Sequence, residues 1–201
     1  MNYLAHLYLA EQSREGLLGG LLGDFVKGRL DNRFTITVRR GIALHRAIDS
    51  YTDAHPLHLK SRNRIGRERR RYAGIIVDVC YDHFLCRRWA DYSSENLGCF
   101  AERVYDVLRE HQDALPDRLR GIAPHMIADD WLGSYANLEN VGRALDGIAR
   151  RFKRSNPLAG ALSEIEANYA ALEDDFQHFF PQLEAQARQI QSTLVHRRET
   201  D

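Results

Sequence analysis

The chain has 201 residues, 44% of them hydrophobic and 28% charged, and this length suits one globular domain that buries roughly 70% of its unfolded surface. Its 28 basic residues balance its 28 acidic residues, so the net charge of zero excludes polyanion binding driven by the charge of the whole molecule. Any electrostatic preference for a partner must therefore come from local clusters of charge.

Apolar residues follow helical spacing through almost the whole chain. The helices that this spacing predicts cover residues 14–26, 35–51, 75–89, 95–113, 118–137, 138–152 and 158–178. Thr35 suits the N-cap of the second helix, and Pro181 suits the first turn of a last helix, where the missing N–H of proline costs nothing. Because strand-like alternation is nearly absent, we predict an all-α, single-domain bundle of about eight to ten helices over residues 1–196, with 197–201 as a frayed tail.

Three cysteines, Cys80, Cys86 and Cys99, lack the C-x-x-C spacing of a zinc or redox motif. An odd number without that spacing favours free thiols in a reducing compartment. No run reaches the roughly 18 apolar residues that a membrane span requires, and the N-terminus lacks the basic region of a secretion signal. We therefore expect a cytoplasmic protein with no membrane segment and no removed leader.

Titratable residues interrupt the apolar run IIVDVCYDHFL. Asp78 and Asp82 are spaced i, i+4, about 40° apart around a helix, so they share a face that His83 borders. Two carboxylates this close repel each other and raise one pKa unless a cation lies between them. A divalent metal is one candidate for that cation. An arginine is the other, with Arg87 and Arg88 as the nearest in sequence.

Three other segments place a titratable residue in an apolar context. His45 and Asp49 are spaced i, i+4 in GIALHRAID, Asp24 lies in LLGDFVKG, and His6 lies in YLAHLYLA. Helical bundles build metal sites from such inward side chains on facing helices. Mixed histidine and carboxylate ligands suit Mn²⁺, Mg²⁺ or Fe²⁺ better than a structural zinc site. A hydrogen-bonded polar network without a metal is the alternative.

Other enzyme motifs are absent from the sequence. It contains no G-x-S-x-G elbow, no P-loop and no G-x-G-x-x-G after a strand. The glycines of GLLGGLLGDF lie in a helical pattern and favour close helix packing. Residues 60–71, KSRNRIGRERRR, carry seven Lys or Arg against one Glu, and this basic segment is either a solvated surface or a site for an anionic partner. Its few aromatic residues argue against single-stranded nucleic acid.

Several segments together resemble the acyl carrier protein phosphodiesterase family. They are MNYLAHLYLA, GLLGDFVKG, GIALHRAID, VDVCYDHFL, the pair Trp131-Leu132 and NYAALEDDF. The resemblance implies hydrolysis of the phosphodiester that joins 4′-phosphopantetheine to a serine of holo-acyl carrier protein. It also implies an HD-phosphohydrolase-like all-α fold and a divalent cofactor, Mn²⁺ or Mg²⁺. HD enzymes carry an adjacent His-Asp pair, whereas this chain has the reverse order, Asp82-His83.

The resemblance and the residues above together give the candidate site. The expected metal ligands are Asp24, His45, Asp78 and Asp82. The expected catalytic residues are Asp24, Asp49, His83 and His6. The expected substrate-binding residues are Lys27, Arg46, Arg67 and Arg70, with segment 60–71 facing an acidic carrier protein.

Two other functions stay open at the level of sequence. One is an HD-like nucleotide phosphohydrolase, and the other is a non-catalytic helical module that binds the carrier protein. We expect no nucleic-acid or membrane partner, and the sequence does not predict an oligomeric state.

Overall fold

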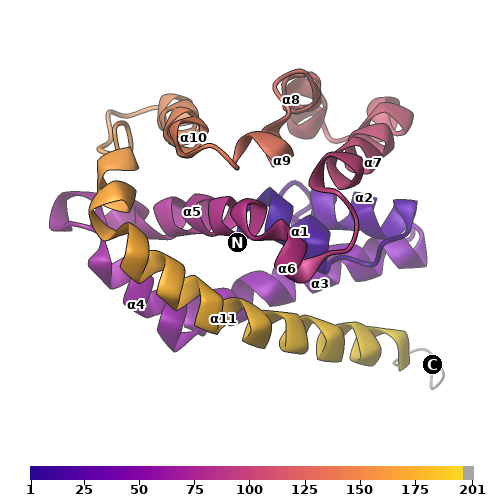
Figure 1. The fold of residues 1–201 in the computed structure, drawn as a ribbon. Coiled ribbons are helices and arrows are strands. Elements are labelled where there is room, and N and C mark those ends of the chain that lie inside the picture. Colours follow the sequence, from indigo (N-terminus) through magenta and orange to yellow (C-terminus); the bar gives the residue numbers. More distant parts are fainter. Residues whose placement is uncertain (197–201) are drawn as a thin grey trace.

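Helices form the regular structure of the protein in the computed structural model, which describes residues 1–196 (Figure 1). Within this range about nine helices have seven or more residues and no strand occurs, which confirms the all-α prediction. The longer helices are α1 (Tyr3–Leu9), α2 (Arg14–Leu22), α3 (Ile36–Ala54), α4 (Pro56–Arg64), α5 (Ala73–Arg87), α7 (Leu97–Glu110), α8 (Asp117–Ala128), α10 (Leu138–Arg151) and α11 (Leu162–His196). The short elements are the helices α6 (Trp89–Tyr92) and α9 (Trp131–Ser134) and the 3-10 helices η1 (Arg67–Tyr72) and η2 (Gln112–Ala114). The predicted tail, 197–201, lies outside the described residues, and the single-domain prediction stays a prediction.

Helix α5 is the central helix, and it contacts α1, α4, α10 and α11. Its apolar residues are buried on every side, from Ile76 and Val77 to Phe84 and Leu85. A helix that is apolar all round is a core helix or a membrane span, and none of the described helices has the length and apolar character to cross a bilayer. In Figure 1, α8, α9 and α10 lie on one side of α5, and α3, α4 and α11 lie on the other. The polar residues of the IIVDVCYDHFL run are therefore enclosed by helices.

Helices α2 and α3 approach each other closely at two glycines. A Cβ atom on Gly19 would lie 2.6 Å from the carbonyl oxygen of Val38 and 2.8 Å from the Cα atom of Gly41. Any larger side chain would push the two backbones apart. The glycines of α2 therefore serve helix packing, as the sequence predicts, and their close approach brings the end of α2 against the middle of α3.

Pro181 lies inside α11, so the prediction that it begins a new helix is wrong. An internal proline removes one backbone hydrogen bond and clashes with the preceding turn, at a cost of about 3 kcal/mol. The rings of Phe176, Phe179 and Phe180 are fully buried just before it. This packing holds the backbone of α11 on the core and outweighs the local cost, so the two predicted segments form one helix.

The helix predicted over 118–137 is two helices, α8 and α9, separated at Asp130. Asp130 has a φ of 43°, in the left-handed region where a right-handed helix cannot continue. Its carboxylate accepts hydrogen bonds from the backbone N–H of Gly133 at 3.2 Å and from the hydroxyl of Tyr105 at 2.9 Å. These bonds stabilise the break, which lets α9 direct Leu132 into the core.

Candidate metal centre

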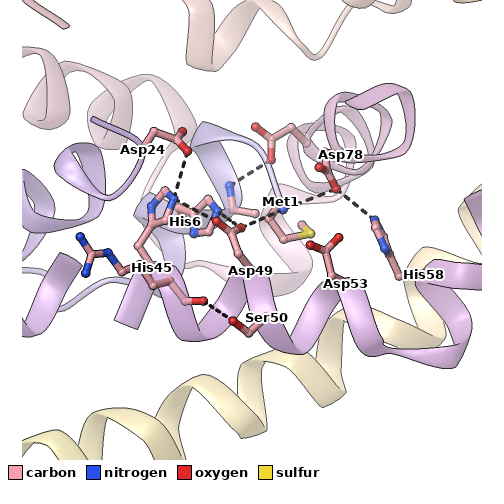
Figure 2. A network of polar contacts seen from close by, with 12 residues as sticks. Met1, His6, Asp24, His45, Asp49, Ser50, Asp53, His58 and Asp78 are labelled. Carbon is pink, nitrogen blue, oxygen red and sulfur yellow. Dashed lines mark hydrogen bonds and ion pairs between the residues drawn. The ribbon is translucent and has the colours of Figure 1, made fainter. Parts of the chain in front are cut away.

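Two imidazoles and one carboxylate meet where α1 lies against α3. His6 comes from α1, and His45 and Asp49 come from successive turns of α3 (Figure 2). The imidazole rings stack with their centroids 3.5 Å apart, and His6 Nε2 donates to Asp49 Oδ1 at 3.0 Å. One ligand atom from each residue lies within 4.8 Å of the other two, so the group, called the His–Asp cluster below, could hold a metal ion.

Asp24 is the fourth polar side chain at this cluster. Helix α2 ends at Leu22, so Asp24 lies in the turn that follows and not in the helix predicted over 14–26. Its Oδ1 atom is 3.5 Å from His45 Nε2. The side chains of Asp24 and Asp49 are 50% and 40% exposed, whereas the two imidazoles are 2% exposed. The cluster therefore has a buried nitrogen side and an open carboxylate side.

The ring of His45 is oriented by the backbone behind it. Its Nδ1–H donates to the carbonyl oxygen of Gly20 at 2.8 Å, which leaves Nε2 as the free nitrogen of the neutral ring. Nε2 is buried and has no hydrogen-bond partner within residues 1–196, although Asp24 and Asp49 lie 3.5 Å and 3.4 Å away. Metal-binding histidines are commonly oriented in this way by a carbonyl on the other nitrogen. The free nitrogen and the nitrogen and carboxylate donors around it fit a divalent cation.

The two imidazoles differ in protonation. Burial, together with the neighbouring His45, lowers the pKa of His6 to about 4. Burial also lowers the pKa of His45, but the carboxylates of Asp24 and Asp49 outweigh burial and raise the pKa to about 9. Near neutral pH His45 therefore carries a positive charge between two carboxylates when no other cation is present. A metal ion bound to Nε2 has to displace that proton.

Asp78 borders the His–Asp cluster through the amino group of the first residue. The Met1 α-ammonium lies 3.3 Å from Asp49 Oδ1 and 3.4 Å from Asp78 Oδ1 (Figure 2). His58 Nε2 donates to the same Asp78 oxygen at 3.0 Å. Burial raises the pKa of Asp78, but the ammonium and His58 outweigh it and lower the pKa. The sequence does not single out His58, because no carboxylate lies four residues before or after it.

Asp82 binds the start of α1. Its Oδ2 and Oδ1 atoms accept the backbone N–H groups of Leu4 at 2.8 Å and Ala5 at 3.0 Å. These two groups belong to the first turn of α1, where backbone donors have no partner within the helix. Burial raises the pKa of Asp82 to about 7 against the effect of the two hydrogen bonds. The compensation for Asp82 is therefore the N-terminus of another helix, and not an arginine of α5.

His83 points away from the cluster, towards α9 and α11. Its Nδ1–H donates to the carbonyl oxygen of Tyr135 at 2.7 Å, and its Nε2 accepts from the hydroxyl of Tyr169 at 2.9 Å. Both nitrogens are therefore engaged.

The structure brings four predicted site residues together and sets the others apart. The residues that meet are His6, Asp24, His45 and Asp49, with Asp78 at their edge.

The loop after Asp24 is held by Arg46. The guanidinium of Arg46 donates to the carbonyl oxygens of Val26 at 2.7 Å and Gly28 at 2.9 Å. These bonds engage the arginine with the loop backbone beside the His–Asp cluster. Lys27, between the two carbonyls, is exposed. Of these two predicted substrate-binding residues, Lys27 is therefore the one whose charged group is free of the loop.

Much of the basic segment 60–71 is neutralised within the protein. Lys60 Nζ and Arg64 Nε lie 2.7 Å and 2.8 Å from the carboxylate oxygens of Asp175. Arg62 pairs with Asp53 at 3.4 Å, and Arg69 pairs with Glu164 at 3.1 Å. Arg70 donates to the uncharged side chain of Asn63 at 2.6 Å and keeps its positive charge. Arg67, Arg70 and Arg71 are exposed and have no ion pair in the described part of the chain. The positive potential of this segment is lower than its sequence suggests.

Comparison with known proteins decides the family. The model of a family described as acyl carrier protein phosphodiesterase matches residues 1–183. The chain belongs to this family. As an acyl carrier protein phosphodiesterase it is a hydrolase that converts holo-acyl carrier protein to apo-acyl carrier protein. This confirms the first of the three predicted functions and the family that the sequence segments resemble.

Curated relatives of the same name extend over almost the whole chain. An acyl carrier protein phosphodiesterase from Serratia proteamaculans (strain 568) is 38% identical over 192 residues, which is 95% of this chain and 100% of the relative. One from Photorhabdus laumondii is 34% identical over 90% of this chain and 92% of its own length. One from Escherichia coli O157:H7 is 36% identical over 93% of this chain and 97% of its own length. No solved structure matches the chain significantly.

Proposed function

We propose that the His–Asp cluster and Asp24 hold the divalent cation, Mn²⁺ or Mg²⁺, with which this phosphodiesterase releases 4′-phosphopantetheine from the carrier serine. The observation that supports the proposal is the buried Nε2 atom of His45, which has no hydrogen-bond partner within residues 1–196 and lies beside two carboxylates. Buried polar atoms are nearly always paired. A cation shared by His45, Asp24 and Asp49 supplies the missing partner and balances the two negative charges.

Two predicted ligands, Asp78 and Asp82, are left out of the proposed set because they have other partners. Both oxygens of Asp82 accept backbone N–H groups of α1, so a cation would have to compete with them. Asp78 is bound by His58 and by the Met1 ammonium, and we assign it the role of positioning the start of the chain beside the cluster. His83 is also left out, since both of its ring nitrogens are engaged on the other side of α5.

The residues around the cluster can each contribute to phosphodiester hydrolysis. A bound divalent cation would neutralise the phosphodiester and lower the pKa of the attacking water. Asp24 is half exposed, and its carboxylate oxygen that does not face His45 can accept a proton from that water. Lys27, exposed in the loop held by Arg46, is proposed to bind a non-bridging phosphate oxygen. Cleavage leaves the phosphate on pantetheine and a hydroxyl group on the carrier serine.

Intact-mass spectrometry of the carrier protein tests this proposal. After incubation with the enzyme and Mn²⁺, holo-carrier should lose the mass of one phosphopantetheine group, and chelation should stop the loss. His45→Ala and Asp49→Ala should each lower turnover by about a hundredfold or more and should weaken Mn²⁺ binding in equilibrium dialysis. Asp91→Asn, an exposed change on α6, should alter neither quantity. Full Mn²⁺ binding by both alanine variants would contradict the proposed ligands.

A further inference from the structure

Two arginines stack on aromatic rings near the open side of the His–Asp cluster. The guanidinium carbon of Arg118, in α8, is 5.8 Å from the ring centroid of Phe25, the residue after Asp24. That of Arg151, at the end of α10, is 5.5 Å from the ring centroid of Trp131. Both arginines are exposed, and neither side chain forms an ion pair within residues 1–196. An aromatic face holds a guanidinium in place without using its N–H donors, so these donors are available to a partner.

Tyr3 connects both arginines with the metal centre. It lies at the start of α1, three residues before His6. Burial and the carboxylate of Asp24 raise the pKa of Tyr3 to about 12, while Arg151 and Arg118 act on the same hydroxyl in the opposite direction. Such charge effects fade over about 10 Å in salt solution. Arg118 lies beside the exposed carboxylate of Asp24, because its aromatic partner Phe25 directly follows Asp24, and Arg151 acts on the same Tyr3 hydroxyl.

More cations continue this surface at the end of α10. The stretch RRFKR, residues 150–154, has four Lys or Arg and no carboxylate. All five residues are exposed, including Phe152 with 42% of its surface accessible. None of the four cationic side chains has an ion pair in the part of the chain that the structure describes. By contrast, Arg143, two turns earlier on α10, lies 3.8 Å from Glu139. Arg118 and residues 150–154 are called the α8/α10 basic surface below.

We propose that the α8/α10 basic surface, and not segment 60–71, docks the acidic side chains of the carrier protein beside the metal centre. The inference rests on the family's activity towards a carrier protein and on the proposed place of the metal. Segment 60–71 begins in α4, on the opposite side of α5 from α8 and α10 (Figure 1). It approaches the end of α10 only in η1, where the ring of Tyr72 lies 5.5 Å from that of Phe152. Four of its seven cations form ion pairs within the protein, whereas the cations of the α8/α10 basic surface have none within residues 1–196 and are free to meet carboxylates of a partner.

The number and spread of these cations indicate a partner with several negative charges. A phosphodiester carries one negative charge, and the proposed metal ion at the cluster meets it. The exposed cations come from α8, the end of α10 and the segment that follows α10, so they match anions spread over a folded surface, and the exposed ring of Phe152 adds an apolar contact. Carboxylates on a protein satisfy these conditions. Complementary charges of this kind mainly raise the association rate and fix the orientation of the partner.

Binding of apo-carrier protein to the metal-free enzyme tests docking separately from catalysis, because apo-carrier has no phosphodiester to cleave. The double variant Arg118→Glu with Arg151→Glu should weaken Kd by about tenfold or more in fluorescence anisotropy at low salt. Arg143→Glu reverses another exposed charge on α10 and is the matched control, expected to change Kd by less than about twofold. With holo-carrier and Mn²⁺, the double variant should raise KM while kcat stays within about threefold.

The possible failures of the two proposals are distinguishable. An unchanged Kd in the double variant overturns docking at this surface, even if the wild-type enzyme releases phosphopantetheine. Charge-dependent binding without turnover supports docking and contradicts only the proposed metal chemistry. A larger loss of affinity in Arg67→Glu with Arg70→Glu would assign docking to segment 60–71. Equal binding of a single-stranded oligonucleotide would also overturn the proposal, because the surface would then be a general polyanion site. Circular dichroism verifies that each variant keeps its helices.

Discussion

The ring of His45 depends on two glycines in the segment that precedes Asp24. The carbonyl oxygen of Gly20 accepts from Nδ1, and Gly23 leaves room for the ring, because a Cβ atom there would lie 2.1 Å from Cγ of His45. The segment 20–24 thus orients one proposed ligand and supplies another. We therefore expect a substitution that alters this backbone segment to disturb the metal centre, as a substitution of a ligand would.

We predict that Gly23→Ala weakens metal binding without unfolding the protein. Gly23 has a φ of −53°, which alanine adopts readily, so the helix content should not change. The added Cβ forces the His45 ring to move, and Mn²⁺ affinity in titration calorimetry should fall by about tenfold or more. Gly121→Ala in α8 is the control, because an added Cβ there meets no atom within 4 Å. Equal affinities of the two variants would show that the His45 ring is not a ligand.

At the scale of helices, a buried carboxylate joins α4 to α11. Asp175 is fully buried in α11 and accepts hydrogen bonds from Arg64 Nε at 2.8 Å and Ser61 Oγ at 3.0 Å. Lys60 Nζ lies 2.7 Å from its other oxygen. Burial raises the pKa of Asp175, but the two cations and the hydroxyl outweigh burial and lower it. Two cations of segment 60–71, Lys60 and Arg64, therefore stabilise the contact between α4 and α11.

We predict that Asp175→Asn destabilises the protein more at neutral pH than in acid. At pH 7 it should lower the free energy of unfolding by about 3 kcal/mol, at the low end for breaking a buried ion pair because Lys60 remains half exposed. The folded-state pKa of Asp175 is lower than its unfolded-state value, so its contribution is present above the unfolded pKa and is lost as pH falls through the folded pKa. Urea unfolding at pH 7 and pH 3 measures both differences.

Asp174→Asn, one residue earlier and 61% exposed, is the control for Asp175→Asn and should change stability little at either pH. A stability difference between wild type and Asp175→Asn that is the same at pH 7 and pH 3 would show that the charge of Asp175 does not stabilise the α4–α11 contact.

Across the whole molecule, sequence spacing correctly predicts those features that depend only on residues of the same helix. Thr35 caps α3 by accepting from the N–H of Val38, and His45 and Asp49 meet on one face of α3, as their spacing indicates. The partners of Asp82, in contrast, lie 77 and 78 residues away in the sequence. Such a partner follows from how α1 packs on α5, which no local pattern encodes. The prediction that Pro181 begins a new helix is wrong for the same reason. Packing of α11 against core residues that are distant in the sequence determines the backbone conformation at this proline.

The proposed ligands come from α1, the turn after α2, and α3, so a bound cation would cross-link three segments of the fold. A ligand that binds only the folded state stabilises it by about 2.7 kcal/mol at a concentration of 100 times Kd. For a chain of this size we expect Mn²⁺ to raise Tm by about 5–10 °C at pH 8. The rise should be smaller at pH 6, because the proton on His45, with a pKa of about 9, then competes more strongly with the metal. Thermal scans with and without Mn²⁺ should show no rise in His45→Ala and the full rise in Asp91→Asn, and an equal rise in all three proteins would assign the ion to another site.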